Sequence, residues 1–154
     1  MAGVSDITVE YNTDTARTII SMIDSGRAIE CSDAKFIYSH AGGTILALPG
    51  RFLGQQATRA SLAKQADPKS RLGQLRRFYY DTAGSTNPIQ MTALRQLIGM
   101  SQIVFGTDFP FGRSANIAAG LEGVRRVQRR GAAGHRSRQH APACAQIRVN
   151  ADHP

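Results

Sequence analysis

Residues 35–43 read Lys-Phe-Ile-Tyr-Ser-His-Ala-Gly-Gly, an apolar run that ends in a histidine followed by two glycines. A short run rich in β-branched and aromatic side chains predicts a buried strand. Catalytic groups of parallel α/β folds gather at the carboxyl ends of strands, and glycines there let backbone or ligand approach closely. We therefore expect His40 to occupy a functional position. The alternative is a histidine at the edge of the core, satisfied by a backbone carbonyl.

A second apolar run also ends in a polar residue. Residues 102–111 read Gln-Ile-Val-Phe-Gly-Thr-Asp-Phe-Pro-Phe, which places Asp108 just after a strand. A carboxylate beside so much apolar surface is costly unless it meets a cation, a metal or several donors. The alternative is that Asp108 caps the next helix. Two strands that end in His40 and Asp108 predict a shared rim.

The remaining periodicities set the fold class. An amphipathic helix is predicted to begin at Thr13 or Asp14 and to stop at Gly26. A further strand over residues 77–83 contains Asp81, and Asn87-Pro88 is typical of a helix start. Gly99 is expected to end the helix that Asn87-Pro88 begins. The other expected elements are a helix-permissive stretch at 52–66 and a helix at 115–121. Helices and strands alternate, so the fold class is α/β with a parallel sheet.

Length and composition limit the possibilities. With 154 residues, 42% of them hydrophobic, the chain can form one domain core and not two. It has no apolar run of the roughly 18 to 20 residues that span a bilayer, and no secretory leader pattern. Cys31 and Cys144 are too few for a disulfide framework and lack the short spacing of a metal motif. We expect a cytoplasmic protein without a membrane partner.

The positive charge is concentrated at the carboxyl end. Of the net charge of +8, about +6 comes from residues 124–154, where seven arginines face Asp152 alone. This stretch has neither helical nor strand periodicity, which predicts disorder. Back-translation of residues 133–144 with GC-rich codons also permits a reading-frame change near residues 123 to 131. Because no aromatic residue lies between the arginines, we expect non-specific nucleic-acid affinity at most. The predicted domains are therefore 1–123 and a basic tail at 124–154.

Three of these segments, taken in order, resemble a known family. Residues 36–43 (FIYSHAGG), 78–83 (FYYDTA) and 103–111 (IVFGTDFPF) are similar to the carboxyl-terminal half of the amidohydrolase-related family. The branch that they resemble contains metal-dependent decarboxylases of the aminocarboxymuconate-semialdehyde, resorcylate and methylsalicylate type. Residues 10–17 resemble the helix entry after that family's fifth strand. The resemblance covers roughly residues 5 to 123.

The resemblance implies a (β/α)8 TIM barrel, of which this chain would hold about the last three strands with their helices. His40 then matches the acid/base histidine after strand six, and Asp108 matches the metal-binding aspartate after strand eight. Asp81 ends strand seven and receives no role. The family's other metal ligands are a His-x-His pair and a further histidine, all upstream, and this chain has no histidine before His40. The implied cofactor is a divalent metal, zinc by family, with an incomplete site here.

The implied function is that of a fragment of a metal-dependent enzyme, a nonoxidative decarboxylase (a carbon-carbon lyase) of an aromatic or unsaturated carboxylic acid. That acid is the small-molecule partner, and we expect this chain alone to be inactive. Two alternatives stay open. One is a metal-dependent hydrolase of the same superfamily. The other is a non-catalytic truncated product whose basic tail has non-specific nucleic-acid affinity. A homo-oligomer is also left open.

Overall fold

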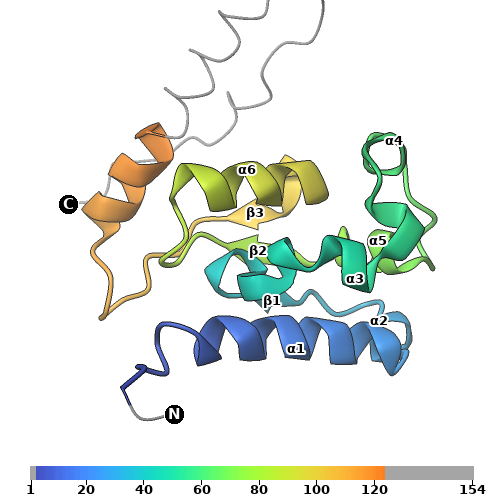
Figure 1. Cartoon of the computed structure of the whole chain (residues 1–154), viewed down its shortest axis with the longest axis horizontal. Coiled ribbons are helices and arrows are strands. Elements are labelled where there is room, and N and C mark those ends of the chain that lie inside the picture. Colours follow the sequence, from blue (N-terminus) through green and yellow to red (C-terminus); the bar gives the residue numbers. More distant parts are fainter. Residues whose placement is uncertain (1–2, 124–154) are drawn as a thin grey trace, which may run out of the picture.

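The computed structural model describes residues 3–123. Within them, three short strands form one parallel sheet in the order β1-β2-β3 (Figure 1). The strands are β1 (Ile37–Tyr38), β2 (Tyr79–Asp81) and β3 (Ile103–Val104). The predicted α/β class with parallel strands is confirmed, and all three strands lie inside the predicted segments. The predicted disorder, reading-frame change and nucleic-acid affinity of residues 124–154 lie outside the described part of the chain.

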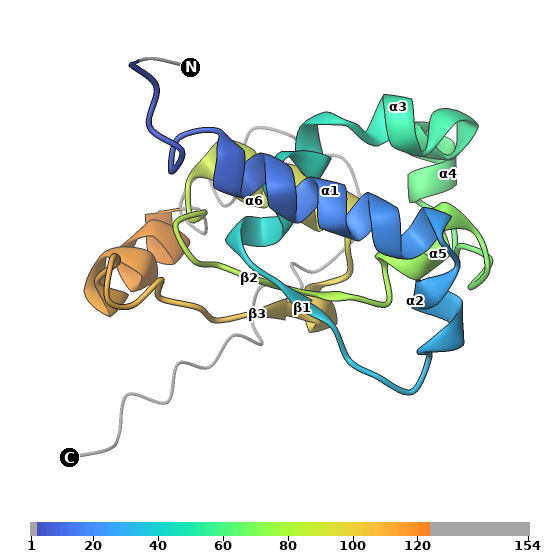
Figure 2. The same ribbon diagram turned by 90° about the horizontal axis from the view of Figure 1, so that it is seen from below.

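Two long helices cover one face of the sheet. Helices α1 (Glu10–Asp24) and α6 (Pro88–Leu97) lie on the same side of the three strands (Figure 2). A helix that begins at residue 114 follows β3. The shorter elements are α2 (Arg27–Glu30), η1 (His40–Ala47), α3 (Pro49–Phe52), η2 (Gly54–Ala57), α4 (Arg59–Leu62), α5 (Arg71–Leu75) and η3 (Met100–Gln102). No helix within residues 3–123 is long and apolar enough to cross a membrane.

Helix α1 begins earlier than the sequence suggested. We predicted a start at Thr13 or Asp14, but the helix starts at Glu10, and Val9 at the N-cap provides no side-chain hydrogen bond. Inside the helix, the Thr13 hydroxyl donates to the Val9 carbonyl at 2.8 Å. A threonine inside a helix can donate to the carbonyl one turn earlier in this way. The preference of threonine for the N-cap therefore did not determine where α1 begins. The end was correct, because Gly26 follows the helix with φ +79°.

Helix α6 has the predicted start. The side chain of Asn87 accepts a hydrogen bond from the backbone N–H of Gln90 at 2.9 Å, and Pro88 occupies the first helical position. Proline has no N–H to leave unsatisfied there, which explains its preference for this site. The helix buries Met91 and Leu94 against the sheet.

The stretch at 52–66 does not form one helix. It is divided among the ends of α3, η2 and α4, and a guanidinium group holds its last part in place. Arg76 donates to the carbonyls of Leu62 at 2.6 Å, Lys64 at 2.8 Å and Leu97 at 3.0 Å. The carbonyls of Leu62 and Lys64, which a continuous helix would have paired internally, thus accept hydrogen bonds from Arg76. The periodicity of the sequence does not indicate such a distant partner.

The core lies between the sheet and the helices. Tyr38 and Tyr80 project from β1 and β2 toward α1 and α6, where Ile19 and Leu94 are fully buried. The neighbouring residue of β1, Ile37, is 62% exposed. Since successive strand residues point to opposite faces, the helices cover one face of the described sheet and leave the other open. One covered face is consistent with part of a barrel, but closure into a (β/α)8 barrel stays a prediction.

Candidate active site at the carboxyl ends of the strands

His40 begins a tight backbone turn directly after β1. His40 and Ala41 both have φ +56°, and Gly42 and Gly43 continue the positive-φ run with +81° and +61°. A Cβ atom added at Gly43 would lie 2.0 Å from the carbonyl oxygen of Asn12. The glycine is therefore needed both for the backbone angle and for contact between this turn and α1. The turn sets the direction in which the His40 side chain leaves the sheet.

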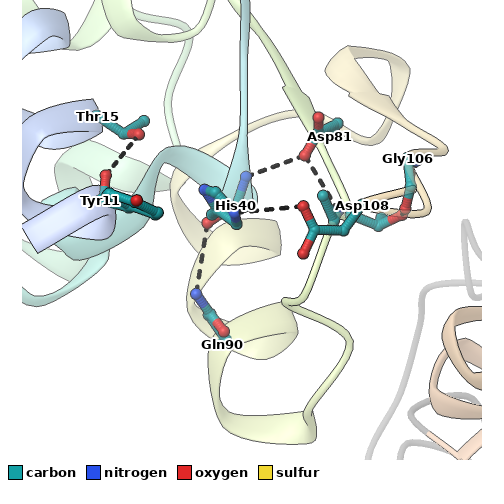
Figure 3. Close-up of polar contacts among 9 residues, drawn as sticks. Tyr11, Thr15, His40, Asp81, Gln90, Gly106 and Asp108 are labelled. Atoms are coloured by element: carbon teal, nitrogen blue, oxygen red, sulfur yellow. Dashed lines mark hydrogen bonds and ion pairs between the residues drawn. The ribbon is translucent and has the colours of Figure 1, made fainter. Parts of the chain in front are cut away.

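His40 and Asp108 meet at the rim of the sheet. The distance from His40 Nε2 to Asp108 Oδ1 is 3.9 Å, and the two side chains are 24% and 36% exposed (Figure 3). This separation is longer than a hydrogen bond and leaves both groups reachable from solvent. The structure therefore brings together the two residues that the sequence singled out. Their chemical roles stay predictions.

The alternatives for both residues are not supported. The atom Nδ1 of His40 is buried and has no hydrogen-bond partner in the described part of the chain, so no carbonyl within residues 3–123 satisfies it. Asp108 has φ +62°, and the following helix begins only at residue 114, so Asp108 is not its N-cap. The prediction that apolar surface surrounds Asp108 is wrong, because Phe109 and Phe111 are 85% and 86% exposed. Asp108 does not lie in an apolar environment.

Asp81 links the strand ends, which the sequence did not predict. Its Oδ1 atom accepts hydrogen bonds from the backbone N–H of His40 at 3.0 Å and from that of Ala83 at 3.1 Å (Figure 3). The only available signal was its position at the end of the strand between the other two. The identity of its partners depends on tertiary structure, which no local pattern encodes.

The loop after β2 lies between His40 and Asp108. Thr82 and Gly106 exchange two hydrogen bonds of 3.1 Å, since the hydroxyl donates to the carbonyl and accepts from the N–H. Gly84 has φ +58°, and a Cβ atom there would lie 3.7 Å from Cδ2 of His40 and 3.9 Å from Oδ2 of Asp108. The middle strand thus contributes the floor of the site.

A cavity of about 470 Å³ opens beside His40. Its polar lining includes Asn12 of α1, Thr44 of η1 and Asn87 and Gln90 at the start of α6, none of which is charged. The side chain of Gln90 also donates to the His40 carbonyl at 3.4 Å. Neutral amide and hydroxyl groups can orient an oxygen-rich ligand by hydrogen bonds.

The described residues do not complete a metal site. Within residues 3–123, no group of three or more His, Cys, Asp or Glu side chains could hold a metal ion. Asp108 and Nε2 of His40 are two donor groups, whereas zinc sites use three or four protein ligands. Asp81 does not complete such a group with them, and its Oδ1 already accepts two backbone N–H groups. The donor set therefore does not fit a metal without further ligands.

Comparison with known proteins identifies the family of the chain. The model of the amidohydrolase family matches residues 4–139. A 6-methylsalicylic acid decarboxylase of Penicillium expansum is 32% identical over 104 residues, which are 66% of this chain and 31% of that protein. Decarboxylase yanB of Aspergillus niger is 34% identical over 114 residues, 71% of this chain and 30% of that protein. The chain thus spans about a third of the length of the curated relatives it matches. Since the family model covers most of its residues, the chain belongs to the amidohydrolase family.

Proposed function

We propose that this chain supplies one part of the active site of a metal-dependent nonoxidative decarboxylase, whose substrate is an aromatic or unsaturated carboxylic acid. The observation that carries the proposal is the approach of His40 Nε2 to Asp108 Oδ1 within 3.9 Å, at the carboxyl ends of β1 and β3. The names of the relatives, which are all decarboxylases, favour carbon-carbon cleavage over the hydrolase alternative.

His40 is the proposed proton donor. In decarboxylation the bond between the carboxylate and its carbon breaks, carbon dioxide leaves, and the electron pair remains on the carbon. A proton must then reach that carbon to give the product. Histidine suits this task because it exchanges protons near neutral pH. The exposed fraction of the His40 side chain, 24%, gives a substrate access to the ring.

Asp108 is proposed as one ligand of a divalent metal, zinc by family. The described residues supply too few donors for a complete site, so the remaining ligands must come from outside residues 3–123. The cavity beside His40 would hold the substrate, and the amides of Asn12 and Gln90 would orient its oxygen atoms. The chain spans about a third of its relatives' length. The activity and the substrate are therefore proposed for the complete barrel and not for this chain alone.

The proposal can be tested in a chimera. Residues 5–123 would replace the corresponding segment of the P. expansum 6-methylsalicylic acid decarboxylase, and release of carbon dioxide from 6-methylsalicylic acid would be measured. We expect the chimera to turn over and the variants His40→Ala and Asp108→Ala to lose turnover, with lower metal content in the second. Asp14→Asn is the control, since within residues 3–123 the one ion pair of this exposed carboxylate is with Arg17. Activity retained in both site variants would refute the proposal.

A further inference from the structure

We propose that Asp81 is a positioning residue, which fixes the backbone of His40 and the spacing between His40 and Asp108. The inference rests on the proposed function in one respect, namely that His40 acts on substrate. The hydrogen bonds themselves can be tested without any assay of turnover. Asp81 is not assigned contact with substrate or with metal.

Asp81 accepts a pair of backbone hydrogen bonds. One N–H comes from His40, 41 positions earlier in the chain, and the other comes from Ala83, two positions later. An ionised carboxylate forms stronger and more directional bonds to N–H groups than a neutral acceptor does. A single oxygen therefore ties the end of β1 to the loop after β2.

The backbone of His40 has an unfavourable conformation that needs a restraint. A residue with a side chain rarely adopts positive φ, and two such residues, His40 and Ala41, stand in sequence here. Such a conformation persists only where surrounding contacts hold it. The His40 N–H is held by Asp81 at 3.0 Å and its carbonyl by Gln90 at 3.4 Å. Of these two contacts the one to Asp81 is the shorter and the charged one, so we assign the main restraint to Asp81.

The side chain of Asp81 also contacts the chain after β3. A Cβ atom at Gly106 would lie 2.9 Å from both Cβ and Cγ of Asp81, so the backbone of the chain after β3 rests on this side chain. Asp108 follows Gly106 by two residues. The side chain of Asp81 therefore contacts the segments that lead to both candidate residues. It sets the distance between the two strand ends as well as the orientation of His40.

The test uses the full chain, labelled with 15N, and compares Asp81→Leu with Asp81→Asn. Leucine is close in size but accepts no hydrogen bond, whereas asparagine keeps one carbonyl oxygen. Hydrogen exchange of the His40 and Ala83 amides and the nuclear Overhauser effect between the His40 ring and Gly84 are measured. We expect Asp81→Leu to speed exchange of both amides by about tenfold or more and to remove the ring contact. Asp81→Asn should speed exchange less than Asp81→Leu does and keep the ring contact, because its carbonyl oxygen still accepts a hydrogen bond.

Matched controls are Asp67→Leu and Asp67→Asn. Asp67 also accepts a backbone N–H, that of Lys69 at 2.9 Å, but it lies in an exposed turn away from the site. These variants should leave His40 unchanged. If Asp81→Leu keeps the amide protection and the ring contact, or if Asp67→Leu loses them as well, the proposal is wrong. If Asp81→Leu does not fold, Asp81→Asn is compared with Asp67→Asn: faster exchange of the His40 amide in Asp81→Asn alone supports the proposal, and equal exchange in the two variants overturns it.

The test of Asp81 can fail or succeed independently of the test of the proposed function. If His40→Ala in the chimera remained active while Asp81→Leu released the His40 backbone, the positioning role would stand and the proton-transfer role would fall. If His40→Ala abolished turnover while Asp81→Leu left the His40 backbone unchanged, the proton-transfer role would stand, and contacts other than Asp81 would orient His40.

Discussion

Replacing Gly43 by alanine should strongly destabilise the fold. The glycine has φ +61° and ψ −137°, a backbone region that is essentially restricted to glycine. Its neighbour is the backbone of α1, because an added Cβ would lie 2.0 Å from the carbonyl oxygen of Asn12 and 2.8 Å from the carbonyl carbon. Neither contact can be relieved by rotating a side chain. The turn that carries His40 would have to move away from the helix.

The cost has two parts. Backbone strain of this kind costs about 1–3 kcal/mol, and forcing an extra methyl group into a packed contact costs about 1–3 kcal/mol more. We therefore expect the free energy of unfolding to fall by about 4 kcal/mol, a large part of the roughly 5–15 kcal/mol that stabilises a typical domain. The matched control is Gly50→Ala. Gly50 lies in α3 and an added Cβ would have no neighbour within 4 Å, so alanine there should stabilise by about 0.5–1 kcal/mol.

Urea unfolding followed by circular dichroism measures both variants. With a slope of about 1–3 kcal/mol per molar urea, Gly43→Ala should lower the midpoint by about 2 M or fail to fold, while Gly50→Ala should not lower it. A Gly43→Ala midpoint equal to that of the unchanged chain would refute the close contact between the turn and α1.

Four further predictions concern stability and metal binding. Tyr80→Phe should cost about 1 kcal/mol in urea unfolding, since it removes the hydrogen bond of 2.8 Å from the hydroxyl to the Leu75 carbonyl. Tyr38→Phe should cost less, because the Tyr38 hydroxyl is buried without a partner in residues 3–123. Burial, with a contribution from Tyr38, raises the pKa of Tyr80 well above its usual range, so the unfolded chain loses this proton first. Stability should therefore be unaffected below about pH 10 and fall above it by about 1.4 kcal/mol per pH unit, and Tyr80→Phe should flatten that fall. In a calorimetric titration, the isolated chain should bind zinc weakly, and in a separate assay it should release no carbon dioxide from aromatic carboxylic acids. Tight stoichiometric zinc binding would mean that ligands outside the described residues complete the site.

The sequence was sufficient to predict elements whose causes are local. Apolar runs located the strands that end near His40 and Asp108, and the Asn87-Pro88 pair located the start of α6. Both signals depend on residues within a few positions of one another. The alternation of helices and strands then predicted that the strands run parallel, because parallel neighbours need long connections.

Features that depend on distant contacts could not be predicted. Asp81 accepts an N–H from a residue 41 positions away, and Arg76 satisfies carbonyls of two other segments. The exposure of Phe109 was also missed, because an aromatic residue beside a strand usually indicates burial. The start of α1 was misplaced because Val9 lacks a capping side chain. In each case the missing information is the position of a partner in space.

The unequal spacing of the paired strands bears on how the chain reaches its final structure. Tyr80 pairs with Ile103 across 23 positions, whereas Ile37 pairs with Tyr79 across 42. Closing the longer loop costs about 0.5 kcal/mol more chain entropy, and that loop also contains several short elements that must fold around Arg76. The unit β2-α6-β3 is thus favoured to form before β1 docks. On that order, Asp81 and Asp108 would be in place before the His40 N–H reaches Asp81.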